Sequence, residues 1–266
     1  MTQIVGSPLK ISPSKATRFR TCPKHYYFQD VERLPVEQRP SPQLAQGNAV
    51  HDALRLFYSI APEDRSQQSI VAALKTVWRK HAKPEVFGNR EAEAAYGRDA
   101  IDMLSRYFDG FDASTLALGL EDWVSTKIEG TEFYGKVDRA ERRRIGDGLD
   151  VIDYKTGRRL LEPEDLRDEP SAQIYLLGGS ETFKEPVVRI RFIYLRTGEE
   201  IAWTPEPEEV VEARERLAKL AREISSTTEF EAFPGPQCQF CPYASRCTDR
   251  HRLSLDALVG DRSLPF

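Results

Sequence analysis

No apolar run in this 266-residue chain approaches the roughly 20 residues that are needed to cross a lipid bilayer. The opening residues, MTQIVGSPLKIS, lack the basic and then apolar layout of a secretory signal. The phosphate-binding loop GxxxxGKS or GxxxxGKT is also missing, so the chain has no nucleotide-driven motor of that type. We therefore expect a cytoplasmic protein that makes no contact with a membrane.

Cysteine is scarce, with four in the chain, and all four fall into one pattern. Cys22 stands in TCPKHYYF, and the others stand in CQFCPYASRC as Cys238, Cys241 and Cys247. In a reducing cytoplasm a CxxC pair is more often a metal or redox site than a disulfide. Four thiolates can bind Zn²⁺ or a 4Fe–4S cluster, and the spacing alone does not separate these two.

Acidic residues slightly outnumber basic ones, and the formal net charge of −4 argues against a protein that coats nucleic acid by bulk attraction. Three basic clusters interrupt this background, at residues 15–24, 142–144 and 155–159. Each cluster alone is typical of solvated surface. Together they favour a phosphate-lined groove, in which Arg142, Arg143 and Arg158 are candidates for contacts with nucleic acid.

Helical patterns dominate the first half of the chain. Ser12 and Pro13 predict a helix start, as N-cap and first helical residue, and this helix would run through residue 27 and carry Cys22 near its end. A linker rich in proline and glutamine is expected at residues 35–46. Further helices are predicted from residue 47, at residues 67–80 and at residues 91–108.

From residue 121 the hydrophobic period changes to two, which predicts β-strands. Strands are expected at residues 121–130, 131–143 and 149–155, with turns at Glu129-Gly130 and at residues 146–148. The remaining elements are a short helix at residues 170–178, a hairpin at residues 187–205 that turns at Thr197-Gly198, and an amphipathic helix at residues 206–224.

This order of helices, sheet and helices predicts a single α/β domain over residues 1–266. No internal repeat or second linker divides it. We separate a helical N-terminal part at residues 12–118, a sheet core at residues 119–205 and a C-terminal part at residues 206–256. The last part holds a helix and the cysteine-rich segment, to which Cys22 is added from the other end of the chain.

Two of the expected strands, GKVDRAE and VIDYKTG, bring reactive side chains together. Because side chains in a strand alternate faces, Asp153 and Lys155 point the same way. Asp138 joins them only if the hairpin register places it on that face. A two-residue turn at Asp147-Gly148 would leave the two aspartates too far apart along the strands, so we expect a wider loop or a bulge at residues 143–148.

Two carboxylates and a lysine suit metal-dependent phosphodiester chemistry. Mg²⁺ and Mn²⁺ prefer oxygen ligands, and a neighbouring lysine can orient water and stabilise charge that develops on a phosphate. His51 lies on a helical stripe with Leu54 and Tyr58, and its imidazole is a further candidate ligand. The plainer alternatives are an exposed Asp153–Lys155 pair and a histidine that simply fills the core.

GNAVHDAL, GKVDRAE and VIDYKTG, in this order, closely resemble the motifs of the PD-(D/E)xK nuclease superfamily, specifically of RecB-like exonucleases. The resemblance implies a restriction-endonuclease-like α/β core, with a central mixed sheet flanked by helices. It implies that Mg²⁺ or Mn²⁺ is bound by His51, Asp138, Asp153 and the carbonyl of Tyr154. It also implies that Lys155 is the catalytic lysine beside the two aspartates.

The family further carries a glutamine and, four residues later, a tyrosine on a helix that contacts DNA and the site. Gln173 in SAQIYLLGG matches the glutamine, and the resemblance implies a catalytic role for it. Position 177 departs from the pattern because it holds Leu177. The nearby Tyr175 would face away from Gln173 on a helix, and it is carried over only as a candidate contact to nucleic acid.

The cysteines resemble those of the iron–sulfur subgroup of these nucleases, which includes AddB-type helicase–nucleases and CRISPR-adaptation exonucleases. SPSKATRFRTCPKHYYF matches the N-terminal segment of that subgroup. The resemblance implies that Cys22, Cys238, Cys241 and Cys247 hold a 4Fe–4S cluster that joins the two ends of the chain. We expect this cluster to be structural.

The leading hypothesis is a metal-dependent DNA exonuclease that acts on single strands or strand ends, in DNA repair and recombination or in CRISPR adaptation. A separate helicase or a CRISPR integrase would be its partner. One alternative is a non-catalytic nucleic-acid-binding subunit, which the departure at Leu177 and the acidic net charge leave open. Another is an interaction protein that zinc stabilises.

Overall fold

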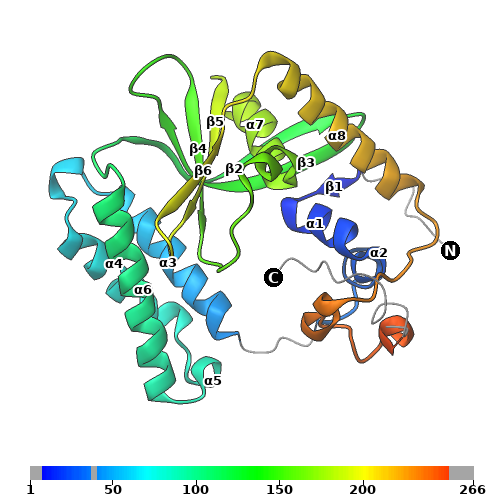
Figure 1. Cartoon of the computed structure of the whole chain (residues 1–266), viewed down its shortest axis with the longest axis horizontal. Helices are drawn as coiled ribbons and strands as arrows, with labels where there is room; N and C mark the ends of the chain where they lie inside the picture. Colours follow the sequence, from blue (N-terminus) through cyan, green and yellow to red (C-terminus); the bar gives the residue numbers. More distant parts are fainter. Residues whose placement is uncertain (1–7, 37–40, 252–266) are drawn as a thin grey trace.

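A computed structural model describes residues 8–36 and 41–251, and in it a six-stranded mixed sheet lies between two layers of helices (Figure 1). The strands are β1 (Lys10–Ile11), β2 (Ala117–Ile128), β3 (Thr131–Arg142), β4 (Leu149–Lys155), β5 (Val187–Tyr194) and β6 (Glu199–Trp203). Their order is β1-β3-β4-β5-β6, with β2 paired to β3. The β1–β3 and β4–β5 pairs are parallel and the other pairs are antiparallel. This is the mixed central sheet of an α/β fold, as the sequence predicted.

Each face of the sheet has its own group of helices and its own core. The helices are α1 (Pro13–Thr21), α2 (Pro23–Tyr26), α3 (Pro42–Tyr58), α4 (Gln67–His81), α5 (Pro84–Phe87), α6 (Arg90–Gly110), α7 (Pro170–Phe183) and α8 (Pro207–Ser226). Short 3-10 or π-helical turns occur at Tyr27–Val31, Pro62–Asp64, Pro163–Asp168, Pro236–Phe240 and Thr248–His251. Buried side chains of α1, α7 and α8 pack on one face, and those of α3, α4 and α6 pack on the other.

The helix predicted at residues 170–178 continues to Phe183 as α7. Two predicted boundaries nearer the N-terminus are also wrong, and local chemistry explains both. The first helix does not continue through Cys22, whose backbone is extended with φ of −162°, because Pro23 disfavours the helical conformation in the residue before it. The helix that carries His51 begins at Pro42, because the Ser41 side chain accepts a hydrogen bond from the backbone N–H of Leu44. Residues 37–40 of the expected linker and residues 252–256 of the C-terminal part lie outside the described residues.

The β3–β4 hairpin has the wider connection that the register argument predicted. Arg139 pairs with Ile152, and Arg142 pairs with Leu149, so residues 143–148 form the loop between the strands. Continued by one step, this register sets Asp138 opposite Asp153. The hairpin therefore brings the two aspartates to the same level of the sheet.

The two ends of the described chain meet beside α2, where the N-terminal segment in blue lies next to the C-terminal segment in orange (Figure 1). The backbone N–H of Lys24 donates to the carbonyl of Glu231 at 3.0 Å, and the Tyr243 hydroxyl donates to the carbonyl of Leu34 at 3.0 Å. These contacts bring Cys22 to the cysteine-rich segment. Among the described residues, no helix has the length and apolar character to cross a membrane.

Helix α7 lies directly on the backbone of β2, and a glycine makes this approach possible. A Cβ atom placed on Gly178 would lie 3.1 Å from the backbone nitrogen of Ser125, which is tighter than ordinary contact. By contrast, a Cβ atom on Gly97 of α6 would lie 3.7 Å from the Trp78 ring, at ordinary contact distance. Gly178 is therefore required for the close packing of its helix on a strand, whereas Gly97 has room for a methyl group.

We expect Gly178→Ala to lower the free energy of unfolding by on the order of 1 kcal/mol, because the strand backbone has no flexible end that can move aside. Gly97→Ala is the matched control, and it should raise that free energy by about 0.5 kcal/mol through its helix propensity. Denaturant unfolding of both variants measures the difference. A Gly178→Ala variant as stable as Gly97→Ala would contradict the close packing.

Candidate active site

Helix α3 approaches the end of β4 closely because Gly47, which faces that end, has no side chain. A Cβ atom on Gly47 would lie 3.0 Å from the Thr156 hydroxyl oxygen, just after Lys155. One turn further along α3, His51 projects toward β3. The GNAVHDAL segment thus supplies both the close approach of the helix and the side chain that the approach positions.

Both oxygens of the Asp138 carboxylate are held. His51 Nδ1 lies 3.0 Å from Asp138 Oδ1, and the backbone N–H of Tyr154 donates to Asp138 Oδ2 at 2.6 Å. Burial lowers the pKa of His51, but the charge of Asp138 opposes this and raises the pKa to about 9. In this geometry the raised pKa favours the protonated imidazole of His51 beside Asp138.

Asp153 and Lys155 form a second pair on the neighbouring strand. Lys155 Nζ donates to Asp153 Oδ2 at 2.8 Å, and the ammonium lies 4.1 Å from the centre of the Phe192 ring. Burial raises the pKa of Asp153, against the opposing charge of Lys155 and with a further rise from Asp138. Burial also acts to lower the pKa of Lys155, but Asp153 outweighs it and the pKa is raised. The lysine is thus a fixed cation next to the acids.

A third carboxylate, which the sequence analysis did not identify, completes the group. Ligand atoms of Glu121, His51 and Asp138 lie within 4.8 Å of one another, and Glu121 Oε2 pairs with Lys136 Nζ at 2.6 Å. Glu121 sits in the middle of β2 with φ of +56°, a left-handed conformation that costs a non-glycine residue on the order of 1–3 kcal/mol. Strain of this kind in a strand centre points to a functional constraint.

A signal for Glu121 was present in the sequence. A tight turn at Glu129-Gly130 pairs Ile128 with Thr131, and the same register, followed along the hairpin, sets Glu121 opposite Asp138. Leu120 and Asp122 do pair with Arg139 and Val137 in this register. Only the departure of Glu121 from strand geometry could not be read from the sequence.

Gln173 and Tyr175 occupy different surroundings on α7. The Gln173 side-chain amide donates to the carbonyl of Arg167 at 2.8 Å and lines a cavity with residues of α1 and α8. Tyr175 is buried against Gly135, whose missing Cβ would lie 2.9 Å from the tyrosine ring. Burial raises the pKa of Tyr175 well above its usual value, and the charges of Asp153, Asp138 and Glu121 raise it further.

The structure thus brings Tyr175 near the acids, whereas the side chain of Gln173 points to the carbonyl of Arg167. Leu177, at the position where the family pattern has a tyrosine, is buried in the core beneath α7. Of the three arginines proposed to contact nucleic acid, Arg142 pairs with Glu185, Arg143 lies 3.7 Å from Asp150, and Arg158 is exposed after the end of β4. Their roles stay predictions.

The four cysteines line one cavity between the two chain ends. This cavity is lined by Cys22, Cys238, Cys241 and Cys247, with Lys24, His25, Phe28 and Phe233 among its other walls. Burial raises the pKa of the Cys241 thiol, and the other three cysteines raise it further, so all four are within electrostatic range. The backbone N–H of Gly235 also donates to Cys238 Sγ at 3.4 Å. The side chains predicted to act together therefore do converge.

A family model described as the PD-(D/E)XK nuclease superfamily matches residues 10–248. The chain belongs to this superfamily. The match includes both chain segments that carry the cysteines and all the residues of the acidic group. Hydrolytic cleavage of nucleic acid is the activity that gives the superfamily its name.

Two solved structures are similar to this chain at low sequence identity, and the first of them shows the same fold. A protein from Eubacterium rectale, described as a candidate exonuclease, has a TM-score of 0.53 at 12% identity, with 94% of this chain and 93% of that chain covered. A protein named SSO0001 has a TM-score of 0.43 at 15% identity, with 92% of this chain and 89% of that chain covered. No curated protein matches the chain.

If the strained backbone of Glu121 serves to place a metal ligand, substitutions at this position will change the Mn²⁺ affinity and the free energy of unfolding in different ways. We expect Glu121→Gln to lower Mn²⁺ affinity about 10-fold, because a neutral amide replaces an anionic oxygen ligand. Glu121→Gly should lose the same affinity but unfold at a higher free energy than Glu121→Gln, by on the order of 1 kcal/mol, because glycine adopts φ of +56° without strain. Titration calorimetry and denaturant unfolding measure the two effects. Wild-type affinity in Glu121→Gln would exclude the residue as a ligand.

Proposed function

We propose that this protein is a metal-dependent deoxyribonuclease that hydrolyses phosphodiester bonds in DNA. The observation that carries the proposal is the convergence of His51, Glu121 and Asp138 within 4.8 Å, next to the Asp153–Lys155 pair. Carboxylate oxygens with one imidazole form a donor set that suits Mg²⁺ or Mn²⁺. The proposal extends the superfamily assignment to a particular metal site and a particular substrate.

The residues divide into those that would hold the metal and one that would act on the reacting groups. His51, Asp138, Asp153 and the carbonyl of Tyr154 are the ligands we propose, and Glu121 joins them. A bound Mg²⁺ or Mn²⁺ would polarise the phosphate and lower the pKa of a water molecule. Lys155 stays protonated because of Asp153, so its ammonium can orient water and stabilise negative charge on the phosphate.

We further propose that the enzyme is an exonuclease on single strands or strand ends, in DNA repair and recombination or in CRISPR adaptation. The similarity of fold to the Eubacterium rectale protein supports this, because that protein is described as a candidate exonuclease. The partner we propose is a helicase or a CRISPR integrase. The site would operate in the cytoplasm on ends that such a partner supplies.

Substitution of the lysine and its aspartate tests the proposed chemistry. We expect Lys155→Ala and Asp153→Asn each to reduce Mn²⁺-dependent cleavage at least about 100-fold, because each removes a charged group at the reacting phosphate. Lys75→Ala is the control, as it removes an exposed lysine from α4, away from the acids. The assay digests 5′- and 3′-labelled single-stranded and duplex DNA. Full activity in both site variants would reject the assignment.

A wild-type protein that binds DNA in a salt-sensitive way but cleaves none with any divalent ion would select the non-catalytic alternative. In that case Lys155→Ala would change binding and nothing else. The convergence of the acids argues for cleavage, because a module that only binds phosphates gains nothing from a cluster of carboxylates beside the backbone it binds.

We propose that the four cysteines hold a structural 4Fe–4S cluster. Zinc at about 2.3 Å from each sulfur would bring the thiolates to about 4 Å from one another. The four thiols line one cavity. A four-iron cluster binds each cysteine to a separate iron, and it is the occupant that the sequence resemblance implies.

Anaerobic purification should yield a coloured protein that contains iron, and Cys241→Ser should lose both the colour and part of the thermal stability. The reason is that cluster binding energy becomes folding energy when the unfolded chain has no preformed site. A visible spectrum, elemental analysis and thermal unfolding measure these outcomes. A colourless protein with one zinc per chain would select the zinc-stabilised alternative, and a fully stable Cys241→Ser variant would oppose any metal at this cavity.

A further inference from the structure

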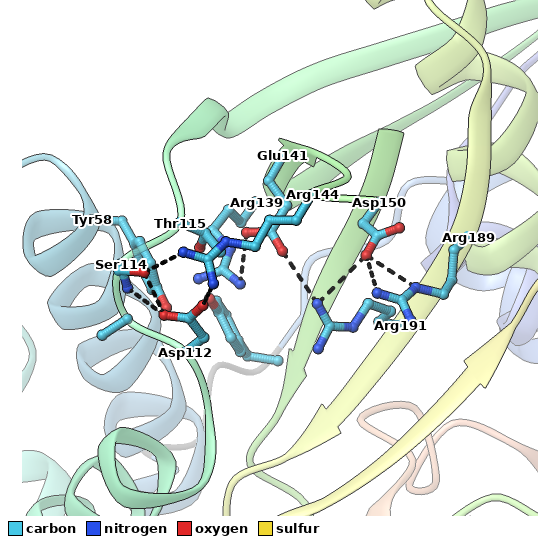
Figure 2. A network of polar contacts seen from close by, with 12 residues as sticks. Tyr58, Asp112, Ser114, Thr115, Arg139, Glu141, Arg144, Asp150, Arg189 and Arg191 are labelled. Atoms are coloured by element: carbon cyan, nitrogen blue, oxygen red, sulfur yellow. Dashed lines mark hydrogen bonds and ion pairs between the residues drawn. The ribbon is translucent and has the colours of Figure 1, made fainter. Parts of the chain in front are cut away.

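One charged residue next to the acidic group is almost completely buried. Arg139 follows Asp138 on β3 and is 2% exposed. Its side chain turns to the sheet face beneath α3 and α6, where Figure 2 shows it in a network of polar contacts. A buried cation is costly unless other groups compensate it, so the surroundings of Arg139 require an explanation.

Three tyrosines and one acid surround this guanidinium. Its centre lies 3.9 Å from the centre of the Tyr58 ring and 5.9 Å from that of Tyr154. Arg139 Nη1 donates to the Tyr107 hydroxyl at 3.0 Å, and Nη2 lies 3.1 Å from Glu141 Oε2. Aromatic faces stabilise a planar guanidinium, and a nearby carboxylate balances its charge. We name Arg139, Tyr58, Tyr107 and Tyr154 the arginine cage.

The cage joins the helix of His51 to the strand of Asp138. Tyr58 lies two turns after His51 on α3, and Arg139 is the neighbour of Asp138 on β3. The helix and the strand are therefore linked twice, by the pair at the acidic group and by the cation–π contact of Tyr58 with Arg139. Only the second link is independent of whether a metal ion occupies the site.

The cage also fixes β4 against β3 at the level of the acids. The hydroxyl oxygens of Tyr107 and Tyr154 are 3.2 Å apart, and those of Tyr58 and Tyr107 are 2.6 Å apart. Tyr154 is the residue whose backbone N–H donates to Asp138. Because the contacts of the Tyr154 ring fix the position of this residue, they also fix the direction of its backbone N–H toward Asp138.

We infer that the arginine cage is a positioning device, which holds His51, Asp138 and the Tyr154 backbone at metal-binding separations before the ion arrives. This inference rests on the proposed function, since it assigns the cage a role toward the proposed metal site. Preorganisation of ligands by groups behind them is a general determinant of metal affinity, and loss of such a group typically costs 10–100-fold. Arg139 and Tyr58 are thus positioning residues that touch neither metal nor substrate.

The decisive comparison uses three substitutions in one turn of α3, made in the full chain. Tyr58→Leu removes the ring above Arg139, and Tyr58→Phe keeps that ring and removes only the hydroxyl. Phe57→Leu removes a fully buried neighbouring ring that packs edge-on against Tyr58, with 5.2 Å between the ring centres, and is no part of the arginine cage. Arg139→Lys is the second route to the same loss if Tyr58→Leu does not fold, because an ammonium cannot reproduce the planar contact.

Two measurements, each compared with the thermal stability of the same variant, report on the position of the site residues. The first is Mn²⁺ affinity by titration calorimetry, where we expect about a 10-fold loss in Tyr58→Leu and Arg139→Lys, and wild-type affinity in Tyr58→Phe and Phe57→Leu. The second is hydrogen exchange of the Tyr154 amide in metal-free protein, which should be faster in the first two variants only. Thermal unfolding is recorded for each variant so that general destabilisation is known.

The outcomes separate this inference from the proposed function. If Tyr58→Leu and Phe57→Leu lose similar thermal stability while both keep wild-type Mn²⁺ affinity and Tyr154 exchange, the cage is merely structural and the inference is overturned. If the wild-type protein binds no Mn²⁺, the proposed function fails, and the exchange of the Tyr154 amide still decides whether the cage positions the strand. Faster exchange together with weaker Mn²⁺ binding supports both.

Discussion

The structure depends on the compensation of like charges at one place on the sheet. Glu121, Asp138 and Asp153 come from three neighbouring strands, and their mutual repulsion in a half-buried site would oppose folding. Each acid has its own basic partner: Lys136, His51 and Lys155 lie 2.6, 3.0 and 2.8 Å from Glu121, Asp138 and Asp153. A divalent ion would take over part of that compensation. The three acids can therefore come together during folding without a metal ion. Their carboxylates can still serve as ligands to one.

Much of this arrangement follows from local sequence. The alternation of apolar residues predicts β2, β3 and β4, and two turn signals set how they pair, so the alignment of Asp138 with Asp153 follows from hairpin geometry. The N-cap at Ser12 follows from a hydroxyl before a proline. These features depend on residues close in the chain, for which propensity and pattern are informative.

What could not be predicted depends on contacts between distant elements. The left-handed backbone of Glu121 is strained, and only contacts formed in the folded site can offset that strain. No residue preference in the sequence predicts it. The orientation of Gln173 is set by the carbonyl of Arg167, and the approach of Tyr175 to the acids depends on the space left by Gly135. The arginine cage draws on α3, α6, β3 and β4, so its members appear in the sequence only as unrelated aromatic and basic residues.

The arginine cage and the cysteine cavity connect different parts of the molecule. The cysteine cavity joins the first helices to the last segment of the described chain, so it closes the chain around the sheet without touching the acids. The cage joins elements that carry the acids themselves. A metal ion at the acidic group can draw ligands together only across small gaps, because ligand distances near 2.1 Å leave little tolerance for Mg²⁺. A fold that supplies His51 from a helix and Asp138 from a strand therefore needs a rigid link between those two elements, and the buried contact of Arg139 with Tyr58 is such a link.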